Sequence, residues 1–193
     1  MGDNQSTQPQ ERRLRVFAAT HLARGLYVAI GLSLASPAIA DPALVSLGIG
    51  GTDILNQQLK TAGDLRLEYR SGLSLLPFFE SYFKIKPWAG IEVTSRHSLY
   101  GAAGILIEVP LGPHFVLTPN IGIGPYNYGG GKNLGSVFEI RSTFEGGYVF
   151  DNGMRLVASI GHTSNAGITR RNPGTEQGMI SFQIPISAMV GGR

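Results

Sequence analysis

The chain alternates apolar and polar residues with a period of two in eight separate segments, and this pattern limits the folds that it can adopt. In the clearest segment, Leu65, Leu67 and Tyr69 alternate with four charged residues. Alternation of this length predicts a β-strand whose two faces meet different environments. The eight predicted strands lie within residues 45–50, 64–70, 84–93, 99–109, 115–123, 137–150, 154–164 and 177–187.

The polar faces of these strands carry a balanced set of charges. The acids are Asp64, Glu68, Glu92, Glu108, Glu139 and Glu145, and the bases are Arg66, Arg70, Lys84, Lys86, Arg141 and Arg155. Opposite charges that alternate with Leu, Ile, Val, Phe and Tyr suit a small barrel with a salt-bridged interior and a lipid-facing exterior. The sequence therefore predicts an all-β fold, an eight-stranded antiparallel up-and-down transmembrane β-barrel with a polar, side-chain-filled interior. A secreted β-sandwich, which would bury the apolar faces, is the alternative.

The first forty residues have the pattern of a secretory signal. Arginines at 12, 13, 15 and 24 precede the apolar stretch 25–35, and Ala38-Ile39-Ala40 forms a small-residue cleavage site. We predict a signal peptide over residues 1–40, cleaved after Ala40, and a barrel domain over 41–193. An uncleaved membrane anchor is the alternative. Cleavage removes four arginines and two acids from a chain of net charge +3, so the basic charge gives no argument for nucleic acid binding.

The connections predict which end of the barrel faces outward. Pro110–Pro113 and Asp151–Gly153 read as tight turns, whereas most of the connections on the other hairpins are longer and polar. Short turns face the periplasm in such barrels and longer loops face outside. The apolar segment 73–83 falls on the short-turn side, and the sequence assigns it no role.

Composition narrows the chemistry of any site. The chain has no cysteine, so it has no disulfide, no thiolate ligand and no cysteine nucleophile. Its four histidines lie far apart without the spacing of metal ligands, and we predict neither a metal nor a cofactor.

The groups needed for acyl transfer gather near the seventh and eighth strands. Period two places His162 and Ser164 on the same face as the apolar residues of the seventh strand, at its outward end. Glu176 shares the parity of the apolar face of the eighth strand, so a hairpin brings it opposite or diagonal to His162. A carboxylate, an imidazole and a hydroxyl in a chain can activate a serine. In the alternative, His162 and Ser164 occupy an interfacial belt and Glu176 pairs with Arg170 or Arg171.

The residues His162-Thr163-Ser164-Asn165-Ala166, followed by Asn172-Pro173-Gly174 and Glu176, resemble the signature of the PagL-type lipid A 3-O-deacylases. The similarity extends to Phe138–Arg141 and the turn after Tyr148. The resemblance implies His162 as the base, Ser164 as the nucleophile and Glu176 as the third member. It makes Asn172 and the amide of Gly167 candidates for the oxyanion hole, with Asn165 shaping the loop.

This resemblance implies a serine ester hydrolase that removes the 3-O acyl chain of lipid A in the outer leaflet of the bacterial outer membrane. Its partners would be lipid A and membrane lipid, and a homodimer is left open. Two groups of residues are expected to contact the substrate. The acyl chains would lie along Met154, Leu156, Ile160, Ile180 and Phe182, and the phosphates would meet Arg96, Lys132, Arg170 and Arg171. A non-enzymatic structural or adhesion barrel and a phospholipid acyl hydrolase are the alternatives.

Overall fold

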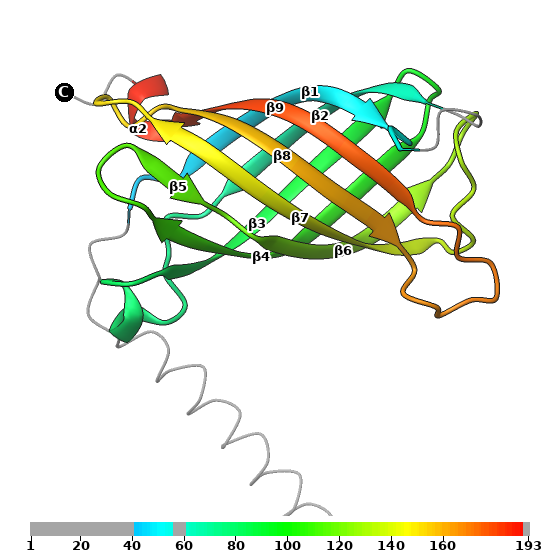
Figure 1. Cartoon of the computed structure of the whole chain (residues 1–193), viewed down its shortest axis with the longest axis horizontal. Helices are drawn as coiled ribbons and strands as arrows, with labels where there is room; N and C mark the ends of the chain where they lie inside the picture. The colour runs from blue at the N-terminus through cyan, green and yellow to red at the C-terminus, as the bar shows by residue number, and fades with distance from the viewer. Residues whose placement is uncertain (1–40, 56–60, 191–193) are drawn as a thin grey trace, which may run out of the picture. The chain divides into compact units, whose positions relative to one another are not determined.

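The alternating segments form a closed antiparallel barrel in the computed structural model, which describes residues 41–55 and 61–190 (Figure 1). The strands are β1 Leu44–Thr52, β2 Ala62–Arg70, β3 Lys84–Thr94, β4 Leu99–Pro110, β5 Phe115–Leu117, β6 Asn120–Asn127, β7 Phe138–Val149, β8 Arg155–Ser164 and β9 Thr175–Pro185. A 3-10 helix, η1, covers Pro77–Phe79, and a short helix, α2, covers Ile186–Met189. The predicted signal peptide lies outside the described residues and stays a prediction.

The barrel closes because the first strand pairs with the last. Leu44 lies opposite Pro185 at one end of the β1–β9 ladder, and Thr52 lies opposite Gln177 at the other. β3 also pairs with β4, which completes the circuit. β5 and β6 together occupy one position in the wall, since each pairs with β4 and with β7. The predicted eight-stranded up-and-down barrel is therefore confirmed.

Two of the predicted strands differ from those observed by more than a shift of one or two residues at an end, or lead into another element, and a proline accounts for each difference. The predicted strand 115–123 is divided into β5 and β6 around Pro119, which has no backbone N–H to donate to the ladder. The last predicted strand, 177–187, ends instead at Pro185, and the chain turns into α2 at Ile186. Pro185 thus sits at the end of its strand, where a missing donor costs little.

The two faces of the wall divide as the alternation predicts. Most of the charged residues of β2, β3 and β7 are buried in the lumen, among them Arg66, Glu68, Arg70, Glu92 and Arg141. The outer face exposes large apolar side chains, including Leu47, Ile49, Leu65, Leu67, Ile91, Ile121, Phe144, Leu156, Ile160 and Ile180. An apolar exterior around a charged interior is the pattern of a membrane-spanning barrel.

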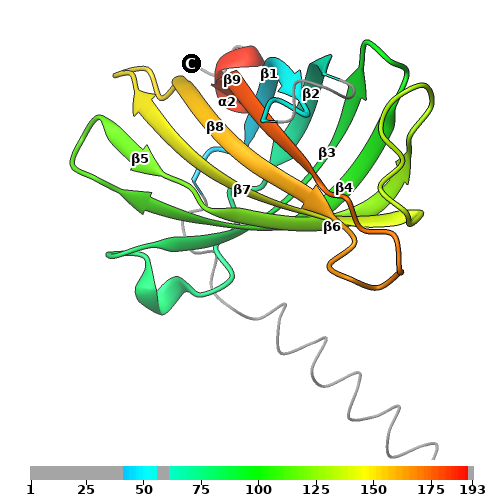
Figure 2. The same ribbon diagram turned by 45° about the vertical axis from the view of Figure 1, so that its right-hand side comes forward.

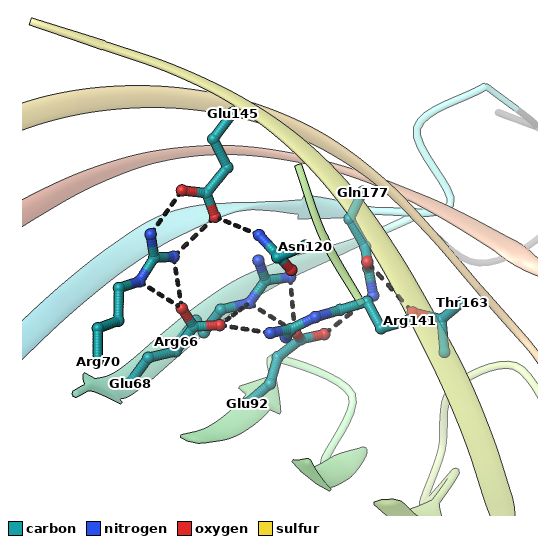
Figure 3. A network of polar contacts seen from close by, with 9 residues as sticks. All are labelled: Arg66, Glu68, Arg70, Glu92, Asn120, Arg141, Glu145, Thr163 and Gln177. Atoms are coloured by element: carbon teal, nitrogen blue, oxygen red, sulfur yellow. Dashed lines mark hydrogen bonds and ion pairs between the residues drawn. The ribbon is translucent and has the colours of Figure 1, made fainter. Parts of the chain in front are cut away.

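Ion pairs and hydrogen bonds fill the lumen (Figure 3). The Arg70 guanidinium bridges Glu68 and Glu145, with 2.7 Å contacts to both carboxylates. Glu92 accepts hydrogen bonds from Arg66 Nε at 2.8 Å and from Arg141 Nη1 at 2.9 Å. Buried charges require this mutual pairing, because burial removes them from the bulk water that would solvate them.

A small apolar cluster completes the interior. It consists of Trp88, Tyr100, Ala102 and Leu106. The Arg141 guanidinium carbon lies 4.8 Å from the centre of the Trp88 ring, so the cluster and the ion pairs are in direct contact. Among the residues that the structure describes, no helix has the length and apolar character needed to cross a membrane.

Candidate active site

The end of the wall formed by β8 and β9 carries the candidate catalytic residues. Ser164 is the last residue of β8, and Glu176 is the second residue of β9. The connection between them extends from the end of the barrel, near the connection between β6 and β7 (Figure 2). The other connections at this end lie between β1 and β2 and between β3 and β4.

His162 and Glu176 face each other directly across the β8–β9 ladder. The distance from His162 Nδ1 to Glu176 Oε1 is 3.4 Å. Their side chains point outward and are partly exposed, at 51% for His162 and 31% for Glu176. Because Glu176 lies at Nδ1, the Nε2 atom of His162 is left to act on a substrate or a nucleophile.

Ser164 lies two residues beyond His162 on the same outer face of β8. Its hydroxyl oxygen accepts a hydrogen bond from the Ala166 backbone N–H at 3.5 Å. Within the described part of the chain, no hydrogen bond joins the Ser164 hydroxyl to His162. Hydrogen bonds between catalytic groups are often long without substrate and shorten when it binds. The structure therefore brings the three side chains to one surface and joins only two of them.

A tight turn follows Ser164 and fixes the direction of the chain. Ala166 and Gly167 both have positive φ, 52° and 81°, and the Ile168 N–H donates to the Asn165 carbonyl oxygen at 3.0 Å. Two central residues with positive φ and this bond define a type I′ turn. The turn leads the chain away from the wall immediately after the hydroxyl group.

Asn165 holds the two neighbouring connections together and is fully buried. Its Nδ2 group donates to the Leu134 carbonyl at 3.0 Å and to the Arg171 carbonyl at 2.8 Å. Gly135 approaches the same carbonyl so closely that a Cβ there would lie 1.8 Å from Arg171 O. The residue predicted to shape the loop therefore also anchors the β6–β7 connection against it.

The two predicted oxyanion-hole donors differ in whether their N–H groups already donate a hydrogen bond. The Gly167 N–H already donates to Asn165 Oδ1 at 3.1 Å. Asn172 accepts a hydrogen bond from the Asn165 N–H through Oδ1 at 3.0 Å. With its oxygen directed at Asn165, the amide NH2 of Asn172 is the group that can donate elsewhere.

Gly174 contacts the imidazole and was not singled out as a separate site residue from the sequence. A Cβ at this position would lie 2.5 Å from His162 Cε1 and 3.0 Å from Nε2. Its φ of +61° is also a conformation that favours glycine. Only a residue without a side chain fits against this edge of the ring, so Gly174 and Glu176 together confine the imidazole.

The predicted substrate contacts lie at different distances from these groups. Ile160 is on the same face as His162 and is 66% exposed. Arg170 and Arg171 are exposed in the β8–β9 connection, and Arg171 Nε donates to the Asn133 carbonyl at 3.3 Å. Met154 precedes β8 at the opposite end of the barrel, roughly 33 Å along the strand from Ser164.

Behind the site, the lumen network reaches the same two strands. Thr163, between His162 and Ser164, donates to Gln177 Oε1 at 3.3 Å, and Gln177 Nε2 donates to Glu92 at 3.1 Å (Figure 3). These hydrogen bonds in the lumen support the β8–β9 register that places His162 opposite Glu176 on the outer face. In residues 41–55 and 61–190, no group of three His, Asp or Glu side chains is placed to hold a metal ion.

Comparison with known proteins agrees with this architecture. Residues 88–185, about half of the chain, match the family model of lipid A 3-O-deacylase (PagL). The chain belongs to the PagL family. The matched range contains all three candidate catalytic residues, and the family identifies the chain as a member of a group of outer-membrane hydrolases. The predicted family and outer-membrane location are therefore confirmed.

Solved structures support the fold. The crystal structure of the outer membrane enzyme PagL is 25% identical, with a TM-score of 0.56 over 74% of this chain and 99% of that chain. A de novo designed transmembrane β-barrel, 10% identical, has a TM-score of 0.52 over 74% of this chain and 92% of that chain, which shows the fold alone. No curated protein sequence matches the chain.

Proposed function

We propose that this protein hydrolyses the ester that links the 3-O acyl chain to lipid A, with Ser164 as the nucleophile, His162 as the general base and Glu176 as the orienting carboxylate. The observation that carries the proposal is the direct pairing of His162 with Glu176 on the outer wall, two residues from Ser164. The membership of the PagL family supplies the substrate class.

The mechanism follows from the order of the groups. Glu176 at Nδ1 favours the imidazole tautomer that carries its proton there, so Nε2 can accept the Ser164 proton. The Ser164 oxygen then attacks the ester carbonyl, and His162 returns the proton to the sugar oxygen as it leaves. A water molecule, deprotonated by His162, next cleaves the acyl-enzyme and releases a fatty acid.

The negative charge that develops on the carbonyl oxygen needs a hydrogen-bond donor. The Asn172 amide is our first candidate, because its oxygen is engaged with Asn165 and its NH2 group remains to donate. The Gly167 N–H is bonded to Asn165 Oδ1 in this structure and would have to exchange that bond for one to the oxyanion.

The position of the site matches a substrate that is itself part of the membrane. His162 and Glu176 are on the lipid-facing wall, near the end that carries three of the four longest connections. We infer that this end lies in the outer leaflet. Apolar side chains continue down the wall from the site at Ile160, Leu156, Ile180 and Phe182, where acyl chains can lie. Arg170 and Arg171 are exposed beside it and can approach the phosphates.

Mass spectrometry of lipid A from cells that express the protein tests this proposal. The wild type should remove one acyl chain, and Ser164→Ala should leave lipid A intact, with a rate reduced by at least about 10³-fold. Ser95→Ala is the matched control, because Ser95 is exposed at the same end of the barrel in the β3–β4 connection and should remain active.

Incubation of the purified barrel with lipid A and with phospholipid, in separate reactions, then tests the substrate class. Release of fatty acid from phospholipid alone, or an unaltered lipid A profile with folded wild-type protein, would refute the deacylase proposal.

A further inference from the structure

The connection between β2 and β3 exposes an apolar surface that the proposed chemistry does not use. It lies at the end of the barrel opposite Ser164, because β2 ends there and β3 begins there. Phe78 is 93% exposed and Tyr82 is 75% exposed, and Leu73, Leu75, Leu76 and Phe79 are also exposed. Glu80 is the one charged residue in 71–83. A water-exposed turn of this length would be expected to be polar.

The segment 73–83, which carries these exposed side chains, has a defined backbone structure. The Leu75 N–H donates to the Ile85 carbonyl at 2.7 Å, and the Tyr82 N–H donates to the Phe79 carbonyl at 2.9 Å. The Phe79 and Phe83 rings stack with their centres 5.6 Å apart. In both views η1 lies beside the end of the wall near the start of β3, not across the opening of the lumen (Figures 1 and 2).

Aromatic residues continue around the wall at this same end. Tyr69 is exposed at the end of β2, and Phe115, Tyr148 and Phe150 lie near the turns on the other side. The Tyr148 ring packs edge-on against Phe115 and Phe150, with centres 5.4 Å and 5.1 Å apart. Aromatic side chains at this level form the girdle with which a barrel meets the membrane–water interface. Segment 73–83 is continuous with that lipid-contacting surface.

The other two connections at this end are built differently. Residues 111–114 and 150–154 are short turns with glycine at positive φ, at Gly112 and Gly153. Only the β2–β3 connection among the described residues at this end adds a 3-10 helix with a projecting phenylalanine. The apolar surface therefore extends the wall on one side of the barrel.

We propose that segment 73–83 is an interfacial anchor that inserts Phe78, Phe79 and Tyr82 among the phospholipids at the end of the barrel opposite the candidate site. The occupant of this surface is lipid, since the segment follows directly on the aromatic girdle at this end of the wall and its large apolar side chains are exposed. The proposal does not depend on the catalytic roles of His162, Ser164 and Glu176.

Single-cysteine spin labelling of the full barrel tests the anchor, because the chain has no cysteine of its own. Phe78→Cys carries the label at the anchor, Leu67→Cys carries it on the lipid-facing wall, and Asp151→Cys carries it on the polar turn at the same end. Each protein is folded into phosphatidylcholine vesicles, and collisions of the label with oxygen and with a water-soluble nickel chelate are measured. Phe78 is nearly fully exposed, so its replacement should not impair folding.

The expected result is a ratio of oxygen to nickel collisions at position 78 several-fold higher than at 151 and approaching that at 67. A ratio at 78 equal to that at 151 would place the segment in water and overturn the proposal. Low collision rates with both reagents would also overturn it, since they would mean that protein, such as a second copy of the chain, covers the surface.

Discussion

The imidazole of His162 is confined by one carboxylate and one glycine, and each restricts it differently. Glu176 sets the orientation of the ring through Nδ1, at 3.4 Å. Gly174 limits its movement at Cε1, between the two ring nitrogens, where even a methyl group would overlap the ring. A general base works only if its free nitrogen is placed within reach of the proton that it takes. Gly174 and Glu176 thus both restrict the position of the His162 ring.

Gly174→Ala should lower kcat by about tenfold or more, because the added methyl group displaces the ring by a fraction of an ångström or more. The barrel should still fold, since Gly174 lies in the β8–β9 connection, outside the strands that form the wall. Steady-state kinetics on lipid A, with folding checked by circular dichroism, gives the result. Gly112→Ala is the control, because Gly112 also has positive φ (+75°) but no neighbour within 4 Å of a Cβ. Equal kinetics for the two variants would contradict a role for Gly174 in placing the imidazole.

The β8–β9 hairpin links the interior of the barrel to the candidate site on its exterior. Alternating residues of each strand point opposite ways, so His162 and Glu176 face outward while Thr163 and Gln177 face the lumen. Gln177 in turn donates to Glu92, which also binds Arg66 and Arg141. The register that sets the outer pair therefore depends on hydrogen bonds formed on the other side of the wall.

Gln177→Met should remove this link, leave a Glu92 oxygen without its donor, and destabilise the barrel by about 1–3 kcal/mol. It should also reduce the rate of deacylation, because Gln177 directly follows Glu176 and a shift of its backbone would move that carboxylate. Gln183→Met is the matched control: Gln183 is buried in the lumen on the same strand but at the far end. Urea unfolding in detergent micelles and the rate on lipid A are measured for both. Lost stability with full activity at position 177 would show that the outer pair is held by the ladder alone.

The sequence was most informative at the level of strands and faces. Parity alone placed His162 and Glu176 on one surface, since a hairpin must pair residues of matching orientation. The break at Pro119 and the end of β9 at Pro185 were missed, because the alternation continues across both residues. The contact of Gly174 with the imidazole and the links made by Asn165 depend on connections folding back in space. The spacing of residues along the sequence does not predict contacts between separate connections.

At the scale of the whole barrel, a second set of charges ties the start of the described chain to the wall. Asp41 binds Lys84 at 2.6 Å and Lys86 at 2.7 Å, and Lys86 also contacts Glu108, which binds Arg155 at 2.7 Å. These residues join the segment before β1 to β3, β4 and β8. Partial burial opposes ionisation of Asp41, but the two ammonium groups outweigh it and lower its pKa below the ordinary 3.8.

Asp41→Asn should therefore destabilise the barrel at neutral pH and have less effect in acid. A carboxylate whose pKa is lowered by folding stabilises the folded state above its ordinary pKa, and that contribution is lost as the pH falls through the folded value. The difference in unfolding free energy between wild type and variant should be constant from pH 7 to about 5 and shrink below 3.8. Urea unfolding across this range gives the difference. A difference that does not change with pH would show that the ion pairs contribute nothing to stability.

The filled interior matters to the cell as well as to the fold. The cavity lined by Tyr100, Tyr126 and Gln177 near the site end of the lumen measures about 20 Å³, which is room for about one water molecule. If the candidate site on the outside of this wall is catalytic, it exchanges reactant and product sideways with the surrounding leaflet. Because buried ion pairs occupy the lumen, we expect additional copies of the protein to open no route for antibiotics or nutrients, so that its abundance can vary without a change in the permeability of the envelope.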